Sequence, residues 1–136
     1  MLRCFDDDNI THVDGSVDPV RDKEIIDTEL QLKDLETIES RIQKVQKQAQ
    51  TGGDKQAKLA YQVLSKFKEA LDEGRNARSV SFDTKDEQQI ARELFLLTAK
   101  PVMYVCNVDE ASALSGNKYV EAVREAVKNE DAEILV

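Results

Sequence analysis

The chain has 136 residues and carries 19 basic and 27 acidic side chains, for a formal net charge of −8. Hydrophobic residues make up 40% of it, enough for a core, but aromatic residues make up only 5%, so aliphatic side chains must build most of that core. Charged residues reach 34%, with only five Gly and two Pro, which argues against a low-complexity chain or an all-β fold. The length suits one domain with long exposed helices.

Nothing in the sequence indicates a membrane span, a secretion signal or a metal site. No apolar run approaches the roughly 18 residues of a membrane helix, so we expect a soluble cytoplasmic protein with no membrane partner. Cys4 and Cys106 form no CxxC pair and lie far from His12, which argues against zinc and against a disulfide scaffold. Both thiols fall in strand-like runs and should be buried. His12 is expected to stabilise a turn, and the acids at 6–8 to cap a strand end.

Both ends of the chain have the character of strands. Residues 2–5 resemble the tail of a strand, and Ile134, Leu135 and Val136 form an apolar run with no turn after it. Because exposed strand edges need a pairing partner, we expect a segment of a longer protein that could self-associate on its own. A small protein with frayed strand ends is the alternative.

A long helix is predicted from Pro19 to a turn at 51–54. Asp18 is a suitable N-cap and Pro19 a suitable first helical residue. From Leu35 onward, apolar residues recur at steps of three and four and form one stripe, and the earlier apolar residues spread over a wider arc that predicts deeper burial. The stripe continues through Ile38, Ile42, Val45 and Ala49, and the wider arc consists of Ile25, Ile26, Leu30 and Leu32.

A second helix is predicted over 55–73, so that the two helices form an antiparallel coiled-coil hairpin. After Gly74 we expect an extended stretch at 78–82 and a helix from a cap at Asp83 and Thr84 to about Leu97. The apolar side chains that recur along the second helix at the same three-four spacing are Ala57, Ala60, Leu64, Phe67 and Leu71.

The last third of the chain predicts strand, helix and strand. Residues 102–106 are an apolar run typical of a parallel strand covered on both faces, 117–128 an amphipathic helix, and 132–136 a strand. The predicted fold is mostly α: an antiparallel coiled-coil hairpin inserted in a partial P-loop α/β domain with a doubly wound parallel sheet. We expect residues 1–18 and 83–136 to belong to the α/β domain and 19–82 to the insertion.

Cations cluster in the predicted hairpin. Between residues 41 and 68 there are seven cations and one acid, Asp54, in an otherwise acidic chain. A basic hairpin tip on an acidic body is typical of an arm that contacts phosphate, so an RNA contact directed at the backbone and sensitive to salt is expected. A solvated helix face is the alternative. The candidate contact residues are Arg41, Lys44, Lys47, Lys55 and Lys58.

The candidate chemistry lies at Asn107, Val108, Asp109 and Glu110, directly after the predicted buried strand. In P-loop folds a nucleotide base lies here, and GTPases carry NKxD, whose Asp accepts from guanine ring nitrogens. Here Val108 replaces the Lys and Glu110 the Asp. The longer carboxylate compromises the paired acceptance from guanine, which favours ATP or relaxed specificity. A polar loop after a strand is the alternative.

Motifs along the whole chain resemble the YchF, or Obg-like ATPase, family of translation-factor NTPases. They comprise Arg3-Cys4-Phe5, Asp6, Asp8, His12, Val13, Gly15, Asp18, Pro19, Asp22, Thr28-Glu29-Leu30, Gly52-Gly53-Asp54, Arg78-Ser79-Val80 and Lys100-Pro101-Val102. The resemblance implies the family's middle portion, from a protein that binds ATP, or GTP, with Mg²⁺, hydrolyses it slowly and associates with ribosomes. It also implies that Asn107, Glu110 and the backbone at Val108 hold the purine base. Asp109 matches no role in the family.

This sequence contains no GxxxxGK[ST] phosphate loop, so phosphoryl transfer has nothing to stabilise its charge. We therefore expect no catalytic residue, no metal site, no tightly bound cofactor and no hydrolysis from this chain alone, whereas the family hydrolyses ATP or GTP. A non-catalytic coiled-coil module that binds RNA or a protein is the second hypothesis. The choice of ATP or GTP, the ribosomal component, the activating partner and the oligomeric state stay open.

Overall fold

The computed structural model describes residues 1–6, 17–50, 55–130 and 132–136, without the side chains of residues 49 and 50. The expectations for Asp7, Asp8, His12, the turn at 51–54 and the Ala49 side chain fall outside what it describes. The described chain divides into two compact units. We call residues 1–26 with 101–136 the α/β unit, and residues 27–100 the helical unit.

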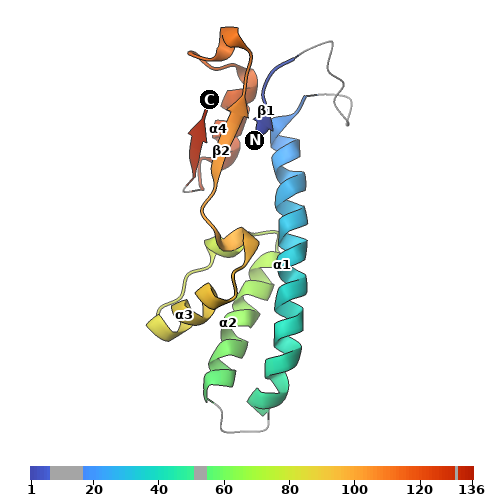
Figure 1. Ribbon diagram of the computed structural model, residues 1–136, viewed down its shortest axis with the longest axis vertical. Coiled ribbons are helices and arrows are strands. Elements are labelled where there is room, and N and C mark those ends of the chain that lie inside the picture. Colours follow the sequence, from blue (N-terminus) through green and yellow to red (C-terminus); the bar gives the residue numbers. More distant parts are fainter. Residues whose placement is uncertain (7–16, 51–54, 131) are drawn as a thin grey trace. The chain divides into compact units, whose positions relative to one another are not determined.

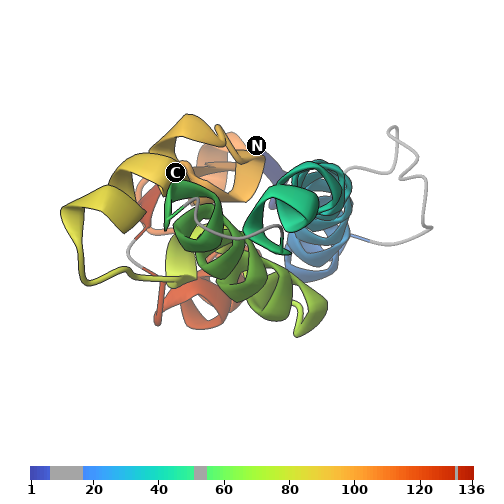
Figure 2. The same ribbon diagram turned by 90° about the horizontal axis from the view of Figure 1, so that it is seen from below.

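Two long helices form the predicted pair, α1 (Pro19–Gln50) and α2 (Lys55–Asp72) (Figure 1). The start of α1 is as predicted, because the Arg21 backbone N–H donates to Asp18 Oδ1 at 3.1 Å. In the helical unit, α1 and a third helix, α3 (Lys85–Glu93), lie on either side of α2 (Figure 2). The pair of long helices is therefore present, and the antiparallel coiled-coil hairpin stays a prediction.

The core of the helical unit follows the predicted apolar stripes. Ile38 of α1 is fully buried and packs with Leu64, Phe67 and Leu71 of α2. Phe67 also meets Phe82 edge-on, with ring centroids 5.2 Å apart. Because each helix brings one residue per turn to the same seam, the two faces close against each other.

The prediction of deeper burial for the first part of α1 is wrong. Ile25, Ile26 and Leu32 are 51%, 47% and 58% exposed, whereas Gln31 and Asp34 are 7% and 2% exposed. The buried stripe of α1 simply continues backward from Ile38 by steps of four and three, through polar residues. Their hydrogen bonds within the unit offset the cost of burying them.

Asp34 closes the helical unit around a buried polar cluster. Its carboxylate accepts from the backbone N–H groups of Leu97 and Thr98, each at 2.8 Å, and from the Thr98 hydroxyl at 2.6 Å. The Thr98 hydroxyl oxygen in turn accepts from the Ala77 N–H at 2.8 Å. Nearby, Gln31 donates to the Gly74 carbonyl at 3.1 Å. These bonds join α1 to two segments far along the chain.

Between α2 and the next strand the structure differs from the sequence expectations. Part of the stretch expected to be extended is a 3₁₀ turn, η1 (Ala77–Ser79), and α3 ends at Glu93 rather than near residue 97. The chain leaves α3 through Phe95, whose φ of 51° lies in the left-handed region, and enters a second 3₁₀ turn, η2 (Leu97–Ala99). The sequence around Phe95 gives no signal of a helix end, because it is rich in Leu and contains no Gly or Pro.

The α/β unit is built on a three-stranded parallel sheet with the order β1-β2-β3 (Figure 1). Its strands are β1 (Leu2–Arg3), β2 (Met103–Asn107) and β3 (Glu133–Leu135). The register pairs Leu2 with Cys106 and Tyr104 with Ile134. Helix α4 (Lys118–Val127) connects β2 to β3, as expected for a parallel crossover.

Helix α4 covers one face of this sheet. Val120, Val123 and Val127 are buried against Tyr104 and the other inward side chains. On the opposite face, Met103 and Leu135 are 56% and 54% exposed, so the described residues do not cover both faces of β2 as the sequence predicted. The alternating exposure along β2 follows from the alternation of side chains in a strand.

The predicted fold class is confirmed: a mostly helical chain with a helical pair joined to a parallel α/β sheet. Residues 83–100 fall in the helical unit, although the sequence placed them with the α/β domain, and the assignment of domains stays a prediction. Within the described residues, no helix is both long and apolar enough to cross a lipid bilayer.

Candidate nucleotide-base site and basic hairpin

The candidate site lies where β1 and β2 end. Asn107 is the last residue of β2, and its carbonyl oxygen accepts from the Cys4 N–H at 2.8 Å, one residue beyond the end of β1. The parallel register thus brings the ends of the two strands together at the carboxyl edge of the sheet. Ligands of open α/β sheets bind at this edge.

The loop after β2 is held by its own backbone and by Asp109. Val108 is half-buried and packs against the core of the α/β unit. Asp109 caps a 3₁₀ turn, η3 (Glu110–Ser112), by accepting from the Ser112 N–H at 3.2 Å. The turn leaves the side chain of Glu110 exposed. A structural role for Asp109 explains why this carboxylate needs no function in base binding.

Asn117 ties this loop to the end of β1. Its Oδ1 caps α4 by accepting from the N–H groups of Tyr119 and Val120, each at 3.0 Å. Its Nδ2 donates to the Cys4 carbonyl at 2.6 Å. The sequence shows Asn117 as the start of a helix, but the bridge to Cys4 depends on which strand lies next to β2. The positioning role of Asn117 therefore has no local signal in the sequence.

Asp6 was expected to cap the end of a strand, but its side chain forms a hydrogen bond with a residue of α4. Its Oδ1 accepts from the Tyr119 hydroxyl at 2.6 Å. The hydrogen bond to Asp6 raises the pKa of Tyr119, so this phenol keeps its proton to a higher pH than an ordinary tyrosine does. At the end of β1, the Arg3 guanidinium lies 4.9 Å from the centre of the Phe5 ring. Asp6, the last residue described after β1, is thus joined to α4.

The predicted base-binding residues all lie in this loop, but they differ in how exposed they are. The side chains of Asn107 and Glu110 are exposed, and Val108 is half-buried, which leaves its backbone to make a contact. An exposed amide and an exposed carboxylate on either side of a backbone N–H can present donors and an acceptor to a purine edge. Among the described residues, no group of three or more His, Cys, Asp or Glu could hold a metal ion.

The two cysteines are buried and free, as predicted. Cys4 and Cys106 are 0% and 2% exposed and lie on the face of the sheet that α4 covers. Burial, reinforced by the neighbouring Cys106 thiol, raises the pKa of Cys4 to about 12. A thiol with so high a pKa is a poor nucleophile at neutral pH. Both cysteines therefore act as core side chains beneath the candidate site.

The basic residues of the hairpin fall into two groups. Lys66 lies over the Phe82 ring, 5.4 Å from its centre, and Lys68 pairs with Asp72 at 2.8 Å, so both have partners within the helical unit. The side chains of the other five cations are exposed, as that of Lys66 is. These five are the predicted contact residues, Arg41, Lys44 and Lys47 on α1 and Lys55 and Lys58 at the start of α2.

Comparison with known proteins gives one family. No protein-family model matches the chain. Its sequence is 48% identical over 138 residues to the ribosome-binding ATPase YchF of Bacillus subtilis, covering 100% of this chain and 37% of the relative. It is 42% identical to the YchF of Escherichia coli O157:H7, covering 99% and 36% of the two chains. It is 41% identical to Obg-like ATPase 1 of Rattus norvegicus, covering 100% and 35%.

A solved structure supports the same conclusion. The fold matches the YchF GTPase of Schizosaccharomyces pombe with a TM-score of 0.81 at 30% identity, covering 98% of this chain and 37% of that one. Fold and sequence together define a segment of the parallel α/β class. The chain belongs to the YchF and Obg-like ATPase family, and it spans just over a third of the length of the relatives it matches.

Proposed function

We propose that this segment holds the purine base in a YchF-type ATPase, through Asn107, Glu110 and the backbone of Val108. The single observation that carries the proposal is the position of Asn107, at the carboxyl end of the central strand of a parallel sheet. Both polar side chains are exposed there, and the loop that carries them is anchored by Asn117 to the neighbouring strand. The names of the relatives, which say ATPase and GTPase, supply the ligand class.

We propose adenine as the preferred base. An Asp at the last position of NKxD accepts two hydrogen bonds from guanine, and the additional methylene of Glu110 displaces its carboxylate from that position. Adenine has no equivalent pair of donors, so it loses less from the change. Hydrolysis, with Mg²⁺, belongs in this proposal to the longer protein, because this sequence contains no GxxxxGK[ST] loop.

Nucleotide titration tests the base site. Fluorescent ATP and GTP analogues are titrated with Mg²⁺ into a protein extended to the length of its relatives. Asn107→Ala and Glu110→Ala should each weaken ATP binding about tenfold, the usual cost of removing one polar group that bonds a ligand. Glu110→Asp should shift the ratio of affinities toward GTP. Glu121→Ala, an exposed acid on α4, is the matched control and should change nothing.

Three results would contradict the base-site proposal. Unchanged affinity in both Ala variants would remove the site from this loop. A wild-type preference for GTP would show that Glu110 still accepts from guanine. Binding of neither nucleotide would favour the non-catalytic interaction module.

We further propose that the exposed cations of the hairpin bind RNA of the ribosome. The relatives named as ribosome-binding supply the partner, and the clustering of exposed Lys on both helices supplies the chemistry. The group contains one Arg and no aromatic residue. Contact with the phosphate backbone, rather than with bases, therefore fits it best.

Charge reversal tests the RNA contact. Changing Lys44, Lys47, Lys55 and Lys58 to Glu should weaken binding to purified ribosomes and to labelled RNA. The slope of log affinity against log salt should fall by roughly 0.7–0.9 for each Lys that binds a phosphate in the wild-type protein. The matched control reverses four other exposed cations of the helical unit, namely Lys33, Lys85, Arg92 and Lys100. Equal weakening in both sets would mean that only net charge matters, and unchanged binding would make the cluster an ordinary solvated face.

A further inference from the structure

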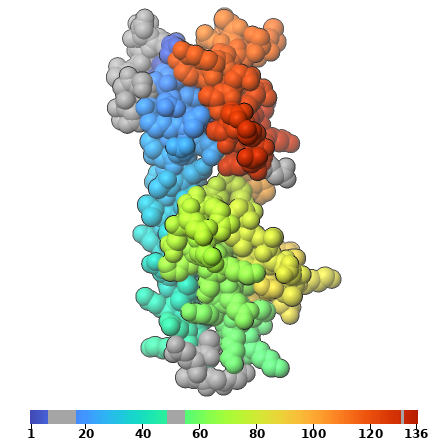
Figure 3. Space-filling view, turned by 180° about the vertical axis from the view of Figure 1, so that it is seen from behind, coloured from blue at the N-terminus to red at the C-terminus, as the bar shows by residue number. Residues whose placement is uncertain are grey.

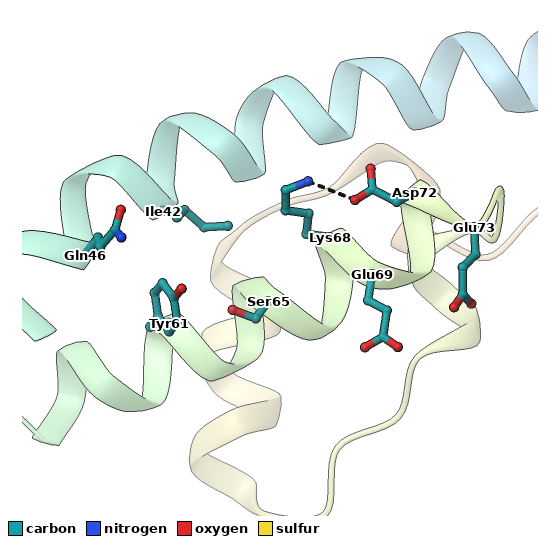
Figure 4. A pocket seen from close by; sticks show the side chains of 8 residues that line it. All are labelled: Ile42, Gln46, Tyr61, Ser65, Lys68, Glu69, Asp72 and Glu73. Atoms are coloured by element: carbon teal, nitrogen blue, oxygen red, sulfur yellow. Dashed lines mark hydrogen bonds and ion pairs between the residues drawn. The ribbon is translucent and has the colours of Figure 1, made fainter.

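A groove of about 600 Å³ runs between α1 and α2 (Figure 4). The surfaces of the two helices lie side by side in the space-filling view, where α1 is cyan and α2 green (Figure 3). Such a volume accommodates a few side chains of a partner rather than a whole helix. Ile42 and Gln46 line the groove from α1, and the opposite wall consists of Tyr61, Ser65, Lys68, Glu69 and Asp72 of α2 with Glu73 directly after it.

One part of the groove is apolar. Ile42 is half-buried against the core of the helical unit, and Tyr61 is 37% exposed, so its ring forms an accessible wall. Gln46 and Ser65 add hydrogen-bonding groups beside these two residues (Figure 4). An aromatic wall next to polar groups is typical of surfaces that bind peptides.

The other part of the groove carries an excess of acid. Lys68 pairs with Asp72 at 2.8 Å (Figure 4). The same ammonium lies 4.0 Å from Glu39, so it interacts with two carboxylates. Glu73 pairs with Arg75 at 2.9 Å. The carboxylate of Glu69 has no ion pair or hydrogen bond to any residue that the structure describes. The Glu69 side chain points away from α1 (Figure 4), so the acceptor capacity left over for a cation lies at the rim of the groove, on the outer side of α2.

We propose that this groove binds a cationic, amphipathic segment of a protein. An apolar side chain of the partner would lie against Ile42 and Tyr61, and a neighbouring Lys or Arg would pair with Glu69. Charge complementarity favours a basic protein over RNA, because the acids of the groove repel phosphates and attract ammonium and guanidinium groups. None of the five cations proposed to bind RNA lines the groove, and the proposal stands without that contact.

Fluorescence anisotropy tests this proposal on the chain as it is. The probes are a short labelled peptide of Lys, Arg and Leu, and a matched peptide in which Glu replaces the basic residues. The basic peptide should bind and the acidic peptide should not. Glu69→Lys with Glu73→Lys should weaken binding of the basic peptide about tenfold, as expected for two partly exposed charges reversed. Circular dichroism checks that each variant keeps its fold.

Matched variants separate the groove from overall charge. Glu121→Lys with Glu125→Lys makes the same change of charge at the same spacing on α4, and it should alter binding less than about twofold. Tyr61→Ser should weaken binding through the apolar wall. Lys68→Gln should strengthen binding about threefold, because it releases Asp72.

The proposal is overturned by any of four results. Equal weakening in the α4 and groove variants would reduce the binding to net charge. Unchanged binding in the groove variant, or tighter binding of the acidic peptide, would remove the site. Weaker binding of labelled RNA in the Tyr61→Ser variant would assign the surface to RNA instead.

Discussion

The two units differ in whether the polar group that joins their segments is buried in the core or lies at the edge of the sheet. In the helical unit, the carboxylate of Asp34 lies 2% exposed in the core and joins α1 to the segment around Thr98. In the α/β unit, the core is apolar or thiol, and the joining group is Asn117 at the edge of the sheet. Burial makes a hydrogen bond costly to lose, whereas partial exposure leaves water as a substitute partner.

This contrast separates two tasks. Asp34 keeps a fold closed and presents no exposed surface to a ligand. Asn117 holds the end of β1 against the loop after β2, which carries the proposed base contacts. Substitutions should therefore affect stability most in the helical unit and the candidate site most in the α/β unit.

Asp34→Ala should give the largest loss of stability. It leaves the donors of Leu97 and Thr98 without their carboxylate, and the removal of a buried, hydrogen-bonded charge costs about 3–5 kcal/mol of unfolding free energy. Urea unfolding followed by circular dichroism measures it. Glu36→Ala, a change on the exposed part of the same helix, should cost less than about 0.5 kcal/mol. A cost below about 1 kcal/mol for Asp34→Ala would show that water replaces the carboxylate.

Asn117→Ala should cost about 1–3 kcal/mol, because it removes a helix cap and the bridge to Cys4. Asn117→Asp keeps the capping oxygen but loses the amide donor. It should therefore recover the part of the unfolding free energy that is due to the helix cap. The same urea titration compares the two variants. Equal destabilisation in both would mean that only the bridge matters.

Stability should fall at alkaline pH because of Cys4. Its pKa rises from 9.0 to about 12 on folding, so between these values the native state binds more protons than the unfolded state, and stability declines with pH. By about pH 10 the decline should be roughly 1 kcal/mol. Cys4→Ala should lower stability at neutral pH but make its alkaline decline shallower. An unchanged pH profile in that variant would assign the decline to other groups.

Phe95→Gly should give the smallest change in the free energy of unfolding, and this change should be an increase. The side chain is 80% exposed, so little packing is lost, and Gly adopts a φ of 51° without the strain that a Cβ causes. A gain of about 0.5–1 kcal/mol in thermal or urea unfolding is expected. Phe95→Ala is the control, since it removes the ring but keeps the strained Cβ. If both variants gain equally, the exposed ring rather than the backbone is responsible.

Local patterns in the sequence predicted most of the fold. Asp18 and Pro19 give the start of α1, the apolar stripe through Ile38 gives the hairpin core, and the dense run at 102–106 gives β2. These signals rest on spacing and capping, which act over a few residues and can be recognised in a single chain. The position of Asn107 after a buried strand followed from the same logic.

Features that depend on distant partners could not be predicted. Nothing local marks Gln31 and Asp34 as buried, because only the fold brings the residues around 74 and 98 to them. Phe95 gives no sign of a helix end in the sequence, although its φ is 51° and its neighbours Leu94 and Leu96 are both buried. The groove beside Tyr61 likewise requires two helices to be placed together before it exists.

The hydrogen bonds of Asp34 also bear on the order in which the helical unit folds. They join residues 64 positions apart in the chain, whereas α1 and α2 are consecutive helices that meet after a short connection. Closing a long loop carries a larger entropic cost than closing a short one and slows the step that requires it. The helical pair should therefore form early, and the capture of Thr98 by Asp34 should be the late event that makes the unit cooperative.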